Sequence, residues 1–409
     1  MTRTRTWAGI HLATLLAGGL WLLYLGRNLW FFFDEWDIVG NHALGLFQPH
    51  NEHWSTLPYL AYRALYPVFG LRQYLPYLAV MLVLHLGVTH LLWRLLRSEG
   101  VGDGSATALA AVFLVFGPGA ENLDWAWQMG FVGSVFFGLA AVLLAATGPP
   151  TRRRDVLAAA ALLAGLMSSG IGVPMLLVTA LAVALRRGPG PAVAIVAVPE
   201  LGFGVWYGIA GHAATAYQRP GALVSLQYMG EGLAATAELG YDVPVVGPAL
   251  VLGAVGWAAW QLSRRREPLA VAAILGAVGL FGIISLGRVQ YGPNQAAAGR
   301  YLYVGGALLV LAAGVALRGL AARGRLGRLA AGVIVAAALL HNAELLAAQE
   351  AAHSAVTAVT RQRVVEAGAG LTGPGPAADP QQRPDPRGAP TLTLSRVAGF
   401  ARDGALPAR

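Results

Sequence analysis

The chain has 409 residues, of which 56% are hydrophobic and only 12% are charged, and its mean hydropathy is +0.56. This composition predicts an integral membrane protein rather than several soluble domains, with most of the apolar surface facing lipid. The chain contains neither cysteine nor lysine, which excludes a disulfide framework, a thiolate metal site and a phosphate-binding P-loop.

The net charge of +9 comes from arginine clusters that lie between the hydrophobic runs. Nucleic-acid binding requires one continuous basic face, so we expect no nucleic-acid partner. With the clusters in the cytoplasm, the whole chain obeys the positive-inside rule and its N-terminus lies inside. The arginine-only usage and the excess of Ala, Gly and Pro are typical of a GC-rich bacterial genome, so we expect a multi-pass protein of the bacterial plasma membrane. The clusters are Arg3 and Arg5, Arg94 and Arg97, Arg152 to Arg154, Arg186 and Arg187, Arg264 to Arg266, and Arg318 to Arg328.

A helix needs about 20 apolar residues to cross a hydrocarbon core about 30 Å thick. On this basis the sequence predicts an all-α polytopic fold with about eleven transmembrane helices. They lie near residues 8–29, 73–96, 105–118, 127–147, 155–168, 171–186, 190–210, 245–263, 268–287, 300–318 and 328–346. The third, fifth and sixth are short, and the break at 167–172 is either a tight outer turn or a re-entrant bend.

This topology predicts a transmembrane domain over residues 1–346 and an outer tail over 347–409. The tail contains Gly-Pro-Gly-Pro and Asp-Pro-Gln-Gln-Arg-Pro-Asp-Pro, which are typical of a partly flexible linker. Three further segments lie on the outer side: 30–72, 117–126 and 211–244.

The outer loop 30–72 begins with Phe31-Phe-Phe-Asp-Glu-Trp-Asp37, which places three acids beside the end of the first span. Two apolar stripes with helical spacing follow, near residues 39–47 and 57–65, and predict two amphipathic helices at the interface. The polar segment Gln48-Pro-His-Asn-Glu-His-Trp54 separates them. Solvated flanking acids or a helix N-cap would explain the same acids, and for Asp37 this structural interpretation is favoured.

These features resemble the GT-C class of integral-membrane glycosyltransferases. The resemblance rests on the acidic pair Asp34-Glu35 after the first span, a second acidic outer segment Glu121-Asn-Leu-Asp124, the long helical first loop and the number of spans. It implies transfer of a sugar from a polyprenyl-phosphate donor to a glycan, lipid or protein acceptor on the outer face. It also implies an inverting mechanism in which a first-loop acid is the general base, with Asp34 favoured and Glu35 the alternate. Raised basicity of a carboxylate near an apolar boundary agrees with this role.

The leaving polyprenyl phosphate requires positive charge, and several arginines lie on the outer side against the topogenic trend. Arg288 ends the ninth span and Arg300 begins the tenth, beside Tyr301, while Arg63, Arg72 and Arg219 lie in other outer segments. Arginine can hold a phosphate through two parallel hydrogen bonds, and tyrosine suits the headgroup level. We therefore expect Arg288, Arg300 and Tyr301 to bind the lipid phosphate.

Other outer residues suit sugar hydroxyls and pyranose faces. Asp124, Trp127 and Gln128 combine a carboxylate, an indole and an amide, although an interfacial aromatic belt explains the same tryptophans. Glu52 and His53 are further candidates for substrate binding.

No cofactor is required by the sequence, but a divalent cation remains an alternative. His50 and His53 could ligate it together with Asp34. A hydrogen-bonded turn is the more common reason for two histidines at this spacing.

Two other classes of function fit the spans. A transporter or lipid-linked-glycan flippase could use Glu200, inside the seventh span, as a proton relay, although Glu200 could also be a neutral acid bonded to a neighbouring helix. A non-catalytic scaffold could use the acidic loop to bind a partner. The glycosyltransferase interpretation requires Asp34, Asp124 and Arg300 to converge on one outer cavity, whereas the transporter requires a central path around Glu200.

Overall fold

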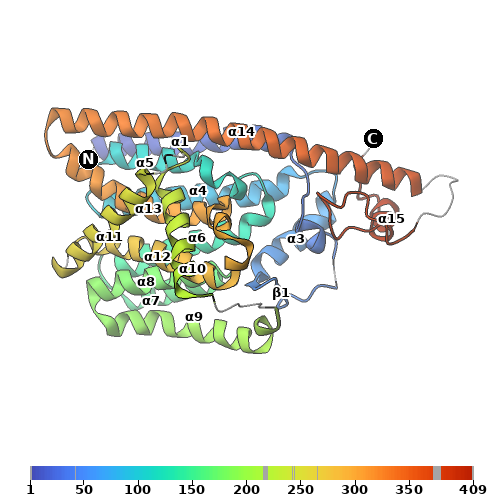
Figure 1. Ribbon diagram of the computed structural model, residues 1–409, viewed down its shortest axis with the longest axis horizontal. Helices are drawn as coiled ribbons and strands as arrows, with labels where there is room; N and C mark the ends of the chain where they lie inside the picture. The colour runs from blue at the N-terminus through green and yellow to red at the C-terminus, as the bar shows by residue number, and fades with distance from the viewer. Residues whose placement is uncertain are drawn as a thin grey trace.

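The computed structural model describes residues 2–41, 43–214, 220–241, 243, 245–264, 266–371 and 379–407. Helices make up nearly all of the regular structure within these ranges, beside one two-stranded hairpin. Figure 1 shows the long helices side by side along the longest axis of the molecule. The end that carries residues 30–72 is called the loop end, and the other is called the opposite end.

Among the described residues, eight helices are long and apolar enough to cross a membrane. They are α1 (Thr2–Leu25), α4 (Leu75–Ser98), α6 (Met129–Ala146), α9 (Pro189–Ile209), α11 (Val246–Arg264), α12 (Pro268–Arg288), α13 (Gly299–Ala321) and α14 (Arg325–Leu371). The shorter helices α5 (Asp103–Leu114), α7 (Arg152–Leu166) and α8 (Gly172–Arg187) occupy the three ranges that the sequence marks as short. A helix therefore lies at each of the eleven ranges, and length and composition support eight of them as spans.

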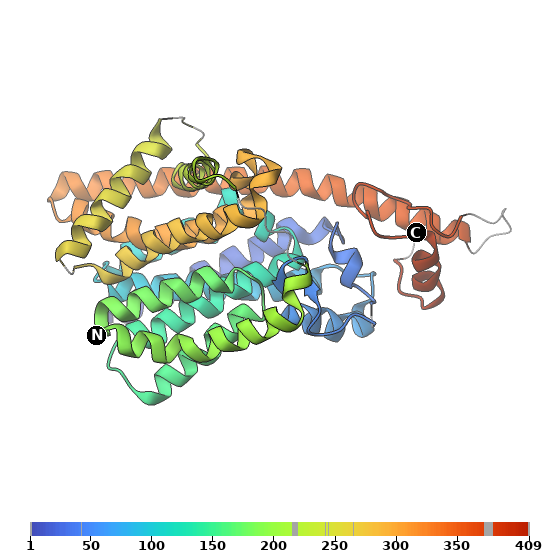
Figure 2. The ribbon, with the colours of Figure 1, turned by 60° about the horizontal axis from the view of Figure 1, so that its bottom comes forward.

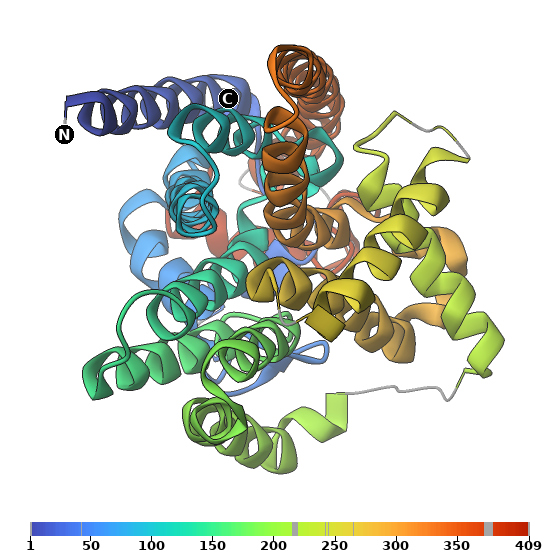
Figure 3. The ribbon, with the colours of Figure 1, turned by 90° about the vertical axis from the view of Figure 1, so that its left-hand side faces the viewer.

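Helix α6 lies in the middle of the bundle, where it packs against α4, α7 and α8, while α12 packs against α8 and α13. Figure 3 looks along the bundle and shows α9 at its periphery. Large apolar side chains cover the outer surfaces of the peripheral helices, including Leu16 on α1, Leu201 on α9 and Leu340 on α14, each at least 65% exposed. Such surfaces are suited to contact with lipid tails rather than water.

The break between α7 and α8 is a tight turn at the loop end. Ser134 of α6 stabilises this turn, because the Ser134 hydroxyl donates a hydrogen bond to the carbonyl oxygen of Gly165 at 2.8 Å. The backbone N–H of Gly170 points toward the first loop and donates to His53. Of the two interpretations of this break, the structure adopts the turn.

The first loop has one of the two helices that its sequence predicts. The helix α3 (Thr56–Phe69) is present. The described residues of the stripe near 39–47 form no helix: the four-residue helix α2 (Glu35–Ile38) ends before the stripe, and the hairpin of β1 (Pro49–His50) and β2 (His53–Trp54) follows it. Gly40 has a φ of +67°, which ends α2 at a position where only glycine is unstrained. The predicted first helix is therefore wrong.

The C-terminal region is more ordered than the sequence predicts. Helix α14 is 47 residues long, and its stretch from 333 to 367 is rich in alanine and free of glycine and proline, so the boundary expected at 346 falls inside a helix. Figure 2 shows α14 extending past the bundle with α15 (Leu394–Arg402) beside it. The Asp385 carboxylate accepts a hydrogen bond from Thr360 of α14 at 2.7 Å. The Gly-Pro-Gly-Pro segment lies outside the described residues.

The region 379–407 also holds the first loop in place. The backbone N–H of Phe33 donates to the carbonyl oxygen of Gly388 at 2.8 Å, and that of Leu71 donates to Ala405 at 2.9 Å. The expected outer segment 211–244 likewise contains a helix, α10 (Ala222–Ala237), which packs against α11, α12 and α13. Arg219 lies outside the described residues.

Candidate functional site

A cavity of about 580 Å³ opens at the loop end, between the first loop, the turn before α8 and the start of α13. Most of the residues predicted to form a site line it, although they come from segments far apart in the chain. They are Asp34, His50, His53, Trp127, Gln128, Arg288, Arg300 and Tyr301. The structure therefore brings together the predicted base and the predicted phosphate ligands.

Asp34 stands directly before α2 with its side chain partly exposed to the cavity. One of its carboxylate oxygens, Oδ2, lies 3.3 Å from Nε2 of His50. The preceding residue, Phe33, has a φ of +49°, a strained conformation for a side chain of this size. Such strain costs on the order of 1–3 kcal/mol and persists only where the surroundings impose it. Here the hydrogen bond from Phe33 to Gly388 holds the turn that presents Asp34.

Glu35, the alternate base, points away from this cavity into the protein and is fully buried. Its carboxylate accepts hydrogen bonds from the hydroxyls of Tyr62 and Tyr74 and from the backbone N–H of Phe32. Burial raises the pKa of Glu35 to about 7, although these hydrogen bonds oppose the shift. The geometry makes Glu35 the link that joins α2, α3 and the start of α4.

The hairpin of β1 and β2 presents the two histidines. Its tip contains Asn51 at a φ of +52°, and His53 accepts a hydrogen bond at Nδ1 from the N–H of Gly170, at 3.2 Å. Burial lowers the pKa of His53 to about 4, so its imidazole is neutral at pH 7. Its Nε2 lies 3.7 Å from Glu52. Burial would raise the pKa of Glu52, but His53 and the guanidinium of Arg288 outweigh it and lower the pKa.

The two predicted phosphate ligands already have acidic partners. Arg288, at the end of α12, forms an ion pair with Glu52. Arg300, in the first turn of α13, pairs with Glu121 at 2.5 Å, and its backbone N–H donates to the same carboxylate at 3.0 Å. A carboxylate at a helix N-terminus offsets the cation there. Each guanidinium has five N–H donors, so both retain donors for a further anion.

An aromatic and amide wall completes the cavity. Trp127 packs edge-on against His50, with ring centroids 5.0 Å apart, and stacks near Tyr59. The Gln128 carbonyl oxygen and the Trp125 indole N–H are buried and lack a hydrogen-bond partner among the described residues. Buried polar groups are rarely left unpaired, so these two atoms are available to a ligand.

Asp124 lies behind this wall rather than in the cavity lining. It is buried, and its Oδ1 lies 3.1 Å from Nδ1 of His353. Burial raises the pKa of Asp124, with His353 opposing the shift. Glu350 is a second buried acid beside this pair. The predicted convergence of Asp34, Asp124 and Arg300 therefore holds for Asp34 and Arg300, while Asp124 supports the site from behind.

His353 and Glu350 were not predicted as site residues, because both lie in the segment interpreted as a partly flexible tail. The available signal was the proline-free, alanine-rich stretch that continues the last apolar run. Two further lining residues were not predicted: Ser168 in the turn before α8 and Gln295 in η6 (Pro293–Ala297).

The metal interpretation of His50 and His53 finds little geometric support. In the described part of the chain, no group of three or more His, Cys, Asp or Glu side chains is arranged to hold a metal ion. His50 faces Asp34, and Nδ1 of His53 is occupied by the N–H of Gly170.

Glu200 is exposed on the outer surface of α9 and does not line the cavity. It therefore lies where a helix would face lipid or a partner.

Comparisons of the chain with protein-family models, curated proteins and solved structures give no significant match in any of the three.

Proposed function

We propose that the protein is a polytopic membrane glycosyltransferase with up to eleven spans that transfers a sugar from a polyprenyl-phosphate donor to a glycan, lipid or protein acceptor. The observation that carries this proposal is the meeting of Asp34 with Arg288 and Arg300 in one cavity at the loop end. A proton acceptor and two cations in one site match the needs of a reaction that removes a proton and releases a phosphate. With the arginine clusters in the cytoplasm, this end faces outward.

In the proposed reaction, an acceptor hydroxyl attacks the anomeric carbon from the side opposite the phosphate. Asp34 takes the hydroxyl proton as the new carbon–oxygen bond forms. The bond between the anomeric carbon and the phosphate oxygen breaks, and both of its electrons stay on that oxygen. The sugar is thereby transferred with inversion at the anomeric carbon.

The leaving group gains one negative charge, because a phosphodiester becomes a phosphomonoester. Arg288 and Arg300 receive this charge through the donors that Glu52 and Glu121 leave open. Tyr301 lies against the Arg300 guanidinium, whose carbon is 5.0 Å from the centre of the tyrosine ring. Trp127 and Gln128 supply an aromatic face and an amide to a sugar ring.

Asp34 rather than Glu35 is assigned as the base. Asp34 is open to the cavity, whereas Glu35 is enclosed by Tyr62 and Tyr74. The transporter alternative depended on Glu200, and its exposed position on α9 gives that alternative no support.

The test is sugar transfer by purified full-length protein from synthetic polyprenyl-phosphate sugars, measured as released polyprenyl phosphate. We expect Asp34→Asn to lower turnover by about 10²–10⁴-fold, the range typical for loss of a general base. Asp37→Asn is the matched control, because Asp37 is an acid of the same segment that does not line the cavity. Wild-type turnover in Asp34→Asn, or an equal loss in both variants, would contradict the proposal.

A further inference from the structure

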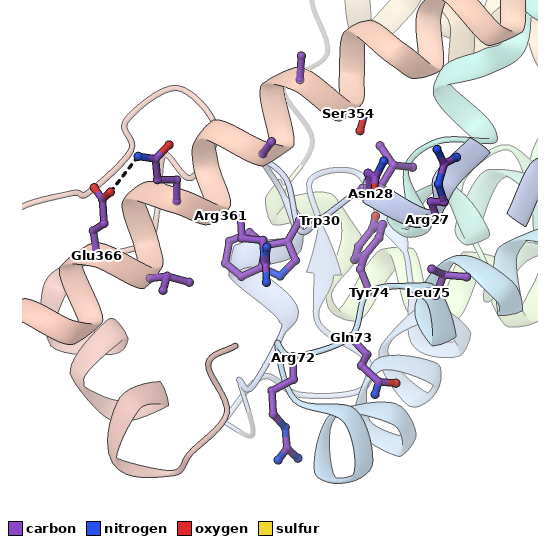
Figure 4. Close-up of a pocket in the computed structure, with 15 residues that line it drawn as sticks. Arg27, Asn28, Trp30, Arg72, Gln73, Tyr74, Leu75, Ser354, Arg361 and Glu366 are labelled. Carbon is purple, nitrogen blue, oxygen red and sulfur yellow. Dashed lines mark hydrogen bonds between the residues drawn. The ribbon is translucent and has the colours of Figure 1, made fainter. Parts of the chain in front are cut away.

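A second and larger cavity, of about 1170 Å³, lies between the end of α1, the start of α4 and the outer half of α14. Figure 4 shows its residues, with Trp30 and Tyr74 between arginines that come from three separate segments. We call it the arginine cavity. Its arginines are Arg27, Arg72 and Arg361.

The three arginines are exposed, and among the described residues no carboxylate lies within ion-pair distance of any of them. Arg27 folds back over the ring of Tyr24, with its guanidinium carbon 3.8 Å from the ring centre. Among the described residues that line the cavity, Glu366 is the one acid, and it accepts a hydrogen bond from Gln362 at 2.9 Å. Three cations and one anion leave the lining with a formal charge of +2.

Neutral donors surround these cations. Asn28, Gln73, Gln362 and Ser354 line the same cavity, while Leu29, Leu75 and Val365 provide apolar wall. Guanidinium and amide N–H groups are suited to phosphate oxygens, and the volume exceeds what a lone phosphate ion needs. The lining therefore fits a phosphate group that is attached to a larger and partly apolar molecule.

The cavity lies at a membrane boundary. The candidate span at α1 ends at Asn28 and that of α4 begins at Leu75, and both residues line the cavity. The depth of a lipid phosphate therefore coincides with the position of these arginines.

We propose that the arginine cavity is a binding site for a phosphate-bearing ligand, separate from the cavity that contains Asp34. Tyr74 and Glu35 stand between the two cavities. Tyr74 lines the arginine cavity and donates to Glu35, which in turn accepts from the N–H of Phe32, a residue of the other cavity. The proposal does not depend on sugar transfer.

The test is isothermal titration of the purified full chain in uncharged detergent. The probes are dihexanoyl phosphatidylglycerol, dihexanoyl phosphatidylcholine of the same chain length, and inorganic phosphate. We expect saturable binding of the anionic lipid that is at least about tenfold tighter than binding of the zwitterionic one. Displacement of the lipid by inorganic phosphate identifies a soluble phosphate source, and its failure to displace identifies a lipid headgroup.

The variants separate this site from the general positive charge of the loop end. Arg72→Gln with Arg361→Gln removes two cavity cations, while the control pair Arg383→Gln with Arg402→Gln removes two exposed cations outside the cavity. We expect the dissociation constant to rise at least about tenfold in the first pair and less than about twofold in the control. Thermal unfolding checks that both pairs are folded. No saturable binding of either anion, or equal weakening in both pairs, would overturn the proposal.

Discussion

The two ends of the helix bundle differ in the contacts of their polar side chains. At the opposite end, arginines are matched with acids that join neighbouring helices: Arg187 holds Asp155 through two hydrogen bonds of 2.7 and 2.8 Å, and Arg186 pairs with Glu99. At the loop end, Gln128, Trp125 and Asn122 keep buried polar atoms unpaired within the described residues. Ion pairs between neighbouring helices are typical of structural contacts. Unpaired buried polar atoms that line a cavity, such as those of Gln128 and Trp125, are typical of a site that binds a ligand.

Backbone strain occurs at both ends, because Glu267 at the opposite end also has a positive φ, of +51°. The loop end contains Phe33 and Asn51 at positive φ, and both flank residues of the cavity that contains Asp34. Backbone strain of this kind clusters where function requires a fixed geometry. We therefore expect substitutions in the cavity that contains Asp34 to change turnover, and substitutions in the ion pairs of the opposite end to change stability.

The largest stability effect that we expect at the loop end comes from Glu35. Its pKa is about 7 in the folded protein and 4.5 without the fold, so the folded protein binds the proton more tightly. The resulting stability is fully present below pH 4.5 and is lost as the pH rises through 7, by about 3 kcal/mol in total. Unfolding midpoints measured from pH 4 to 8 test this.

Glu35→Gln is the control for that pH dependence, because glutamine cannot ionise and can still accept a hydrogen bond from Tyr62. We expect the fall in the midpoint between pH 4.5 and 7 to flatten in this variant. An unchanged fall would show that another group causes it.

The next effect concerns the opposite end. Arg186→Ala leaves Glu99 without its partner, and the Glu99 side chain is only 5% exposed. Removing one member of such a pair costs about 1–3 kcal/mol where some solvent reaches the other. We expect a lower unfolding midpoint but unchanged turnover per folded molecule. A loss of turnover as large as that of Asp34→Asn would remove the distinction between the two ends.

A smaller effect on the KM for the donor tests whether Arg300 binds the lipid phosphate. Arg300→Lys keeps the charge and a partner for Glu121 but loses the planar fork of donors. We expect the KM for the lipid-linked donor to rise about tenfold, which corresponds to about 1.4 kcal/mol. Arg318→Lys at the opposite end is the matched control, because Arg318 also pairs with a glutamate, Glu267. Equal donor KM values in both variants would argue against a phosphate at Arg300.

Hydrophobicity predicted the helices well, because a run of apolar residues has few alternatives to a helix in a membrane. It predicted the first loop less well. The stripe near 39–47 has helical spacing, but Gly40 at positive φ interrupts it and the hairpin around Asn51 follows it. In this segment the turn-forming residues determine the backbone conformation, and the apolar periodicity does not.

The site was predicted in composition but not in arrangement. Asp34 stood out as an acid beside the end of the first span, and Arg288 and Arg300 stood out because arginines on the outer side oppose the positive-inside rule. The burial of Glu35 could not be read from the sequence, since it depends on Tyr62 and Tyr74, 27 and 39 residues away. The partner of Asp124, His353, was hidden by the expectation that the chain beyond 346 is a flexible tail.

The most direct test of the central claim separates donor binding from turnover in Asp34→Asn. If Asp34 is the base and the arginines hold the phosphate, this variant binds the polyprenyl-phosphate sugar within about threefold of wild type while its kcat falls by about 10²–10⁴-fold. Both quantities are measured on the same purified protein, by titration of the donor and by single-turnover transfer. A kcat equal to that of wild type would contradict the account.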